Sequence, residues 1–253
     1  MTDERTAEFL DGPVPIAFAH RGFAPDGAEN SVAAFERAVA LGYAYLETDV
    51  RVTADGVAIA FHDATLNRVT DRRGRISDLP WREVRRARIA GREEIPRLDE
   101  LLAAWPHTRF NLDLKAAASI GPAVDVIRTT NMIDRVCVAA FAERRIEAAR
   151  HALGPRLCTS LGPREALRLR VAPGRFAARC AQVPPRVGRL PFVDERYLAN
   201  ARASGLQVHV WTINDRWEMT RLLDLGVDAI MTDAADVLRD VLVARGQWVS
   251  ATE

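Results

Sequence analysis

Side chains that can move protons, bind cations or bind phosphate gather at the ends of three short apolar runs. Each run contributes one pair: His20 and Arg21, Glu47 and Asp49, and Asp113 and Lys115. If the runs are strands, residues two apart point to the same face. Two carboxylates on one face repel each other and raise each other's pKa, and a divalent cation removes that conflict.

The three carboxylates predict a cation site made of oxygen ligands. Glu47, Asp49 and Asp113 suit Mg²⁺ or Ca²⁺, with Mn²⁺ also accepted, and argue against zinc. A salt-bridge network with Arg21 and Lys115 is the alternative interpretation. Three carboxylates against two cationic side chains leave excess negative charge, which favours the metal.

Two histidines, His20 and His62, lie at strand ends of the same kind. Two histidines beside a charged centre can act as proton donor and proton acceptor, although a strand histidine can also be purely structural. We expect these two to form an acid/base pair. His209, which alternates with Trp211 on a later run, is expected to line the interior.

Arg21 and Lys115 predict a positive clamp for a phosphate group. Lys115 is the single lysine among 35 basic residues, which points to a site that needs a compact ammonium. Trp211 ends a later run and is expected to contact the substrate. Neutralisation of the carboxylates is the alternative role for both cations.

Eight β-rich runs must position these residues: 16–20, 45–50, 110–115, 136–141, 157–161, 180–184, 208–213 and 229–233. Amphipathic, helix-like stretches separate most of them. This alternation predicts an α/β fold, a (β/α)8 TIM barrel. Active sites of such barrels lie at the C-terminal ends of the strands, where the residues above are found.

One segment, about residues 51–94, breaks the alternation and is expected to form a small insertion over the barrel mouth. It begins with Asp55-Gly56 between two β-like stretches, which predicts a two-residue hairpin turn. We expect Asn30 or Ser31 to cap the first helix.

The predicted turn fixes a register in which Ala54 faces Val57 and Asp49 faces His62. Cross-strand neighbours then bring His62 beside Glu47 and Asp49 in one polar cluster. The opposite face is expected to be apolar and buried, with Leu46, Val50, Val52, Val57, Ile59 and Phe61.

Composition excludes several classes of protein. The 35 Lys and Arg residues against 34 Asp and Glu give a net charge of +1, without the positive field of a nucleic-acid binder. No apolar run is long enough to span a membrane, and residues 1–12 lack a signal-peptide core. We expect one cytoplasmic domain, residues 1–253, without a nucleic-acid partner or membrane insertion. Cys137, Cys158 and Cys180 are expected to be small buried residues.

The motifs resemble those of the glycerophosphodiester phosphodiesterase family, in the same order along nearly the whole chain. They are "HRG" (20–22), "ENS" (29–31), "ETDV" (47–50), "TADG" (53–56), "FHD" (61–63), "VWTIND" (210–215) and "IMTD" (230–233). The resemblance implies a barrel with a small insertion after its second strand. Glu29 is then expected to hold the loop after His20 and to approach the metal.

The resemblance also implies roles for the site residues. His20 and His62 are the acid/base pair, Glu47 and Asp49 ligate the metal, and Arg21 and Lys115 contact phosphate. The third ligand in the family is usually glutamate, so Asp113, one methylene shorter, needs a small shift or a bridging water. The register favours His62 as general acid and His20 as general base, with the reverse left open.

The implied reaction releases glycerol 3-phosphate and an alcohol such as choline or ethanolamine, with a cyclic phosphate as one route. A phospholipase D-like relative acting on lysophospholipids or sphingomyelin is an alternative. It requires an apolar entry surface, and Leu190 and Phe192 alone are too few to predict one. A non-catalytic phosphate-binding barrel is disfavoured, because all the chemical groups are present apart from the change at Asp113.

Overall fold

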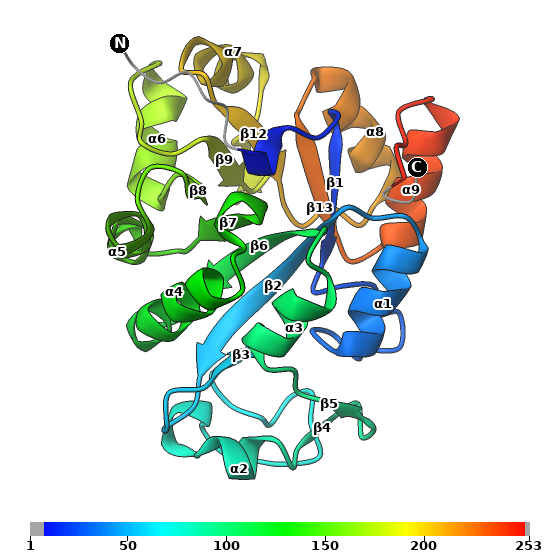
Figure 1. Cartoon of the computed structure of the whole chain (residues 1–253). Coiled ribbons are helices and arrows are strands. Elements are labelled where there is room, and N and C mark those ends of the chain that lie inside the picture. Colours follow the sequence, from blue (N-terminus) through cyan, green and yellow to red (C-terminus); the bar gives the residue numbers. More distant parts are fainter. Residues whose placement is uncertain (1–7, 251–253) are drawn as a thin grey trace.

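Eight parallel strands form the ring of a barrel in the computed structural model, which describes residues 8–250 (Figure 1). In neighbour order the ring runs β8-β7-β6-β2-β1-β13-β12-β9. The eight predicted strands are confirmed, several of them shorter than expected. Their bounds are β1 (Ile16–His20), β2 (Tyr45–Val52), β6 (Arg109–Leu114), β7 (Val136–Ala139), β8 (Cys158–Thr159), β9 (Cys180–Val183), β12 (Gln207–Val210) and β13 (Ala229–Thr232).

The ring closes between β8 and β9 by a single bridge. Ser160 pairs with Cys180, and Leu161 N donates to Cys180 O at 2.8 Å. On the other side of the bridge, Arg179 N donates to Thr159 O at 3.0 Å. The barrel prediction is therefore confirmed, with a short pairing at this position.

After each strand of the ring, directly or after an inserted segment, the chain forms a helix that covers the outside of the ring (Figure 1). The helices are α1 (Val32–Ala40), α3 (Leu98–Ala104), α4 (Ile120–Thr129), α5 (Glu143–Leu153), α6 (Pro163–Val171), α7 (Glu195–Ala203), α8 (Arg216–Leu225) and α9 (Ala235–Ala244). Ser31 caps α1, because its Oγ accepts a hydrogen bond from Ala34 N at 3.2 Å. Within residues 8–250, no helix has both the length and the apolar character needed to cross a bilayer.

Between β2 and α3 the chain forms a small excursion at the lower end of Figure 1. It holds β3 (Ala58–Ala60), α2 (Trp81–Val84), β4 (Arg88–Ile89) and β5 (Glu93–Glu94). It has its own buried apolar cluster: Ala28, Ile59, Phe61, Leu66, Ile76, Val84, Ala87, Ile89 and Ile95. A second, shorter excursion between β9 and α7 holds the hairpin of β10 (Arg186–Val187) and β11 (Leu190–Pro191).

The predicted register of the β2–β3 hairpin is wrong by one residue. Val50 pairs with Ala60. The next residue of the second strand, Phe61, donates its N–H to Asp49 O at 2.9 Å. Phe61 therefore lies opposite Asp49, where the sequence predicted His62. A two-residue type I′ turn needs positive φ at both central residues. Here only Gly56 has positive φ, +85°, and the loop is one residue longer.

The corrected register also divides the apolar face that the sequence predicted. Leu46 and Val50 pack with Ala58 and Ala60 in the core between the sheet and the helices. Ile59 and Phe61 instead pack into the cluster of the excursion. A slip of one residue exchanges the two faces of a strand, which explains this division.

Candidate active site

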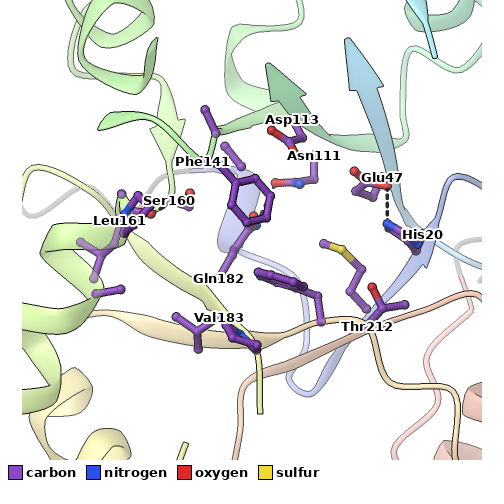
Figure 2. Close-up of a pocket in the computed structure, with 18 of the residues that line it drawn as sticks. His20, Glu47, Asn111, Asp113, Phe141, Ser160, Leu161, Gln182, Val183 and Thr212 are labelled. Atoms are coloured by element: carbon purple, nitrogen blue, oxygen red, sulfur yellow. Dashed lines mark hydrogen bonds and ion pairs between the residues drawn. The ribbon is translucent and has the colours of Figure 1, made fainter. Parts of the chain in front are cut away.

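A pocket of about 490 Å³ opens at the C-terminal ends of the barrel strands. All eight residues that the sequence selected line it: His20, Arg21, Glu47, Asp49, His62, Asp113, Lys115 and Trp211. Figure 2 shows His20 and Glu47 on one side of this pocket, and Leu161 and Val183 on the other. The pocket thus has a charged side and an apolar side.

His20, the last residue of β1, lies between two carboxylates. Its Nδ1 is 2.6 Å from Asp233 Oδ1, and its Nε2 is 3.7 Å from Glu47 Oε2 (Figure 2). Burial alone would lower the pKa of His20, but the charge of Glu47 and the hydrogen bond of Asp233 raise it overall. The imidazole is therefore oriented by one carboxylate and charged more readily because of both.

Glu47 is buried, and its Oε2 accepts a hydrogen bond from the backbone N of Arg21 at 3.1 Å. Burial, followed by repulsion from Asp49, raises the pKa of Glu47 to about 7. The turn that delivers this N–H has Arg21 at φ 56° and Gly22 at φ 77°. A Cβ on Gly22 would lie 2.7 Å from the backbone carbon of Ala34, so glycine is required beside the site.

Asp49 is the centre of the charged side. Its Oδ2 is 3.0 Å from Arg21 Nε and accepts from Asn30 Nδ2 at 3.0 Å, and its Oδ1 is 2.7 Å from Lys115 Nζ. Although burial acts in the opposite direction, Lys115 and Arg21 lower the pKa of Asp49. Asp49 is therefore the carboxylate most readily ionised in the cluster.

Asp113 is the register partner of Asp49 on the adjacent strand and shares its ammonium. Lys115 Nζ lies 2.6 Å from Asp113 Oδ2, between the two carboxylates. Burial raises the pKa of Asp113 despite the attraction of Lys115. In the part of the chain described, Asp113 Oδ1 is buried and has no hydrogen-bond partner. An unpartnered buried carboxylate oxygen in a set of oxygen donors fits a hard divalent cation.

His62 reaches the same pocket from the excursion after β2. Its Nδ1 lies 2.6 Å from Asp63 Oδ1, and its carbonyl accepts from Arg51 Nε at 2.9 Å. Because β3 ends at Ala60, the chain is free to turn His62 toward the pocket. The predicted cluster therefore forms, although not through the predicted register.

Glu29 connects the loop after β1 to the excursion. It accepts from Arg21 Nη1 at 3.0 Å and from Arg68 Nη2 at 2.7 Å. Arg68 Nε also donates to Asp63 Oδ2 at 2.7 Å. The chain of ion pairs from Arg21 to Asp63 holds the Arg21 guanidinium and the partner of His62 in one network, as the expected loop-holding role of Glu29 requires.

The apolar side of the pocket is larger than the sequence indicated. It is formed from the ends of β7, β8 and β9 and from the segments that follow them, including the start of α6 and strand β10: Ala139, Ala140, Phe141, Leu161, Pro163, Ala166, Leu167, Val183, Pro184, Val187 and Phe192. Phe141 and Trp211 pack edge to face, with ring centroids 5.5 Å apart. Phe141, Leu167 and Val187 are also exposed, so the apolar side continues to the molecular surface.

Sequence reasoning missed the carboxylate partners of the histidines. Asp63 directly follows His62, and Asp233 ends the eighth strand run, so each was visible within a motif. Asp233 is 213 residues from His20, and only the closed ring makes them neighbours. Asn30 was also missed: it is buried at φ 58°, and its side chain links Asp49 and Thr48.

Comparison with known proteins gives concordant matches. A sequence model of the glycerophosphoryl diester phosphodiesterase family matches residues 20–237. A probable glycerophosphodiester phosphodiesterase 2 of Mycobacterium tuberculosis is 42% identical over 257 residues, covering 97% of each chain.

Two solved structures share the fold. The structure of a putative glycerophosphoryl diester phosphodiesterase from Silicibacter pomeroyi has a TM-score of 0.82 at 22% identity, covering 96% of this chain and 98% of that one. A phosphodiesterase from Oleispira antarctica, solved with its product sn-glycerol-3-phosphate, has a TM-score of 0.78 at 24% identity and covers 91% and 97%.

Proposed function

This chain belongs to the glycerophosphoryl diester phosphodiesterase family and is a phosphoric diester hydrolase, and we propose that it cleaves glycerophosphodiesters into glycerol 3-phosphate and an alcohol. In this proposal two histidines catalyse the cleavage beside a divalent cation. The observation that carries the proposal is the paired arrangement of the histidines. His20 and His62 each have Nδ1 2.6 Å from a carboxylate, Asp233 and Asp63 respectively, in a pocket with three further carboxylates and two cationic side chains.

The histidine pairs supply proton transfer. A carboxylate on Nδ1 fixes the ring and leaves Nε2 to exchange a proton with the substrate. One histidine removes the proton of the attacking group, which is the glycerol C2 hydroxyl or a water. The other protonates the departing alcohol oxygen. Attack by the C2 hydroxyl gives a cyclic phosphate, which water then opens to glycerol 3-phosphate.

The cationic groups bind the phosphate. Arg21 and Lys115 line the pocket beside Asp49 and stabilise the negative charge that develops on the phosphoryl oxygens. Glu47, Asp49 and Asp113 would hold the divalent cation, which supplies Lewis-acid stabilisation of the same charge. Lys115, now paired with Asp49 and Asp113, would be available to the phosphate if a cation neutralised these carboxylates.

The test is hydrolysis of glycerophosphocholine, glycerophosphoethanolamine and glycerophosphoglycerol, with glycerol 3-phosphate measured by an enzyme-coupled assay. We expect metal-dependent release of glycerol 3-phosphate from at least one. Hydrolysis of a chromogenic diester with no action on any glycerophosphodiester would contradict the proposed substrate class. Binding of these diesters without hydrolysis would instead indicate the non-catalytic barrel.

The apolar side of the pocket favours one second candidate, hydrolysis of lysophospholipids. An acyl chain on the glycerol would lie against Leu161 and Val183 and leave past Leu167 and Val187, which are exposed at the rim. From the sequence alone we expect too little apolar surface for such substrates. The structure supplies more, because single residues from several loops meet on one side.

Rates on glycerophosphocholine and on a short-chain lysophosphatidylcholine, kept below its micelle concentration, separate the two candidates. Leu167→Asp is expected to raise KM about tenfold or more for the lysophospholipid only, since roughly two buried methylenes account for that factor. Val171→Asp is the matched control, because Val171 is exposed on the same helix and does not line the pocket. Equal effects on both substrates would remove the second candidate.

A further inference from the structure

The three cysteines of this chain meet inside the barrel. Cys137, Cys158 and Cys180 come from the consecutive strands β7, β8 and β9, and all are buried. Their Sγ atoms lie within 4.8 Å of one another. No cysteine is left elsewhere in the sequence, so the whole thiol content of the protein is collected at one point.

The spacing of the sulfur atoms matches a metal site. Cys137 Sγ and Cys180 Sγ are 3.9 Å apart, too far for a disulfide bond. Three thiolates around one ion, with metal–sulfur bonds of about 2.3 Å, place their sulfur atoms ~4 Å apart in a planar triangle. The observed arrangement therefore needs little movement to surround an ion.

The surroundings limit the ion to three protein ligands. The thiols lie in an apolar cluster with Phe9, Phe18, Tyr45 and Met231 among its members. Within residues 8–250, no histidine or carboxylate joins the group as a fourth ligand. Zinc in structural sites takes four ligands, and iron–sulfur clusters are usually held by four cysteines.

We propose that Cys137, Cys158 and Cys180 form a three-coordinate site for a single soft cation, with Cu(I) as the ion that it binds. Soft thiolate ligands select Cu(I), and a triangle of thiolates satisfies it without a fourth donor. Binding replaces thiol protons, which leave to solvent.

An ion reaches this site through the floor of the substrate pocket. Gln182 lines that pocket, and its Nε2 lies 4.0 Å from Cys137 Sγ. The same amide donates to Asn111 Oδ1 at 2.8 Å, and Asn111 lines the pocket as well, so Gln182 contacts both the pocket lining and the thiol cluster. Movement of Gln182 would give an ion a path from the pocket to the thiols.

The direct test is anaerobic titration of the reduced protein with Cu(I) against a colorimetric Cu(I) chelator, with Mg²⁺ in excess to occupy the carboxylates. We expect one Cu(I) per chain. X-ray absorption of the wild-type complex should show three sulfur neighbours at about 2.3 Å. A stoichiometry no higher than that of a variant with all three cysteines changed to alanine, or fewer than three sulfur neighbours, overturns the proposal.

Single substitutions locate the site. Cys137→Ser, Cys158→Ser and Cys180→Ser should each weaken Cu(I) binding more than 100-fold, beyond the 10–100-fold effect of removing an outer partner. Ala229→Ser is the matched control, because it adds a hydroxyl to the same cluster and keeps all three thiols. Retained affinity in any cysteine variant overturns the assignment, as does Zn²⁺ displacing Cu(I). Where a serine variant does not fold, the alanine variant and the absorption spectrum of the wild type decide.

Discussion

The two sides of the ring differ in what their strand ends carry. Strands β6, β2, β1 and β13 carry ionisable residues within or directly after their C-terminal halves, whereas β7, β8 and β9 lead into segments that line the pocket with apolar residues. On the charged side each group has a partner of opposite charge, and on the apolar side there is no such network lining the pocket. One pocket thus has ionisable groups on one side and apolar side chains on the other.

Two histidines, one on the charged side and one in the barrel interior, show what the charged neighbours do. His20 has a raised pKa, because its carboxylate neighbours outweigh burial. His209, fully buried on β12 with amide partners Gln182 and Gln207, has its pKa lowered to about 3 by burial alone. The same side chain thus binds a proton more readily beside the carboxylates and less readily in the barrel interior.

Removal of divalent cations should have the largest effect, because three carboxylates then lack their counter-charge. Chelator-treated enzyme is expected to be inactive, and Mg²⁺, Mn²⁺ or Ca²⁺ should restore turnover. The measurement is the release of glycerol 3-phosphate, with circular dichroism as the control for an intact fold. Full turnover in metal-free buffer would show that Lys115 and Arg21 alone neutralise the site.

His20→Ala and His62→Ala should each lower kcat by about 10² to 10⁴, the usual contribution of a positioned acid or base. A p-nitrophenyl diester, whose leaving group needs no protonation, should restore the general-acid variant selectively and so assign the two roles. His209→Gln is the control and should keep its activity. Equal rescue of both variants, or of neither, contradicts a division of labour between the two histidines.

Lys115→Arg tests whether the charged side requires a compact cation between Asp49 and Asp113. A planar guanidinium cannot occupy the position of an ammonium 2.7 and 2.6 Å from two carboxylates, so kcat/KM should fall about tenfold or more. Arg82→Lys, on the exposed surface, is the control. A change within about twofold, ~0.4 kcal/mol, would make the choice of lysine incidental.

The smallest expected effect is on stability and comes from His209. Its pKa is about 3 in the folded protein and about 6.5 when unfolded, so the unfolded chain binds the extra proton between these values. Stability should therefore fall as pH decreases below about 6.5, by about 2 kcal/mol at pH 5.

Urea unfolding of wild type and His209→Gln at pH 7 and pH 5 isolates this contribution, because only the pH dependence is compared. The variant should lose about 2 kcal/mol less between the two values. His151→Gln, at an exposed position on α5, is the control. Identical pH dependence of wild type and His209→Gln would mean that the imidazole is solvated in the folded state.

Features that depend on local sequence were predictable. The eight strands follow from apolar, β-rich runs, and the site followed because a barrel exposes one end of every strand. The hairpin register depended on a single backbone angle, the absence of positive φ at Asp55, which composition does not reveal. The Asp–Gly signal was correct about the turn and wrong about its length.

Features assembled across the ring were not predictable. The contact of His20 with Asp233 needs the first and the last strand of the ring, β1 and β13, to pair with each other, and no local pattern indicates that pairing. The apolar side combines single residues from separate segments, such as Phe141 after β7, Leu167 on α6 and Val187 on β10, and none of them forms a run in the sequence. The extent of the apolar side is therefore visible only in the folded structure, where these segments lie side by side.

The short pairing between β8 and β9 means that the barrel behaves mechanically as a sheet whose two edge strands touch. Backbone amides at this seam should exchange with solvent faster than those of the other strands, because β8 has only two residues and one bridge closes the ring. The strands β6, β2, β1 and β13 occupy the middle of the strand order, as far from the seam as the ring allows. Local opening of the barrel is therefore expected to begin beside the apolar side, so that Glu47, Asp49 and Asp113 lie on the strands whose amides exchange most slowly.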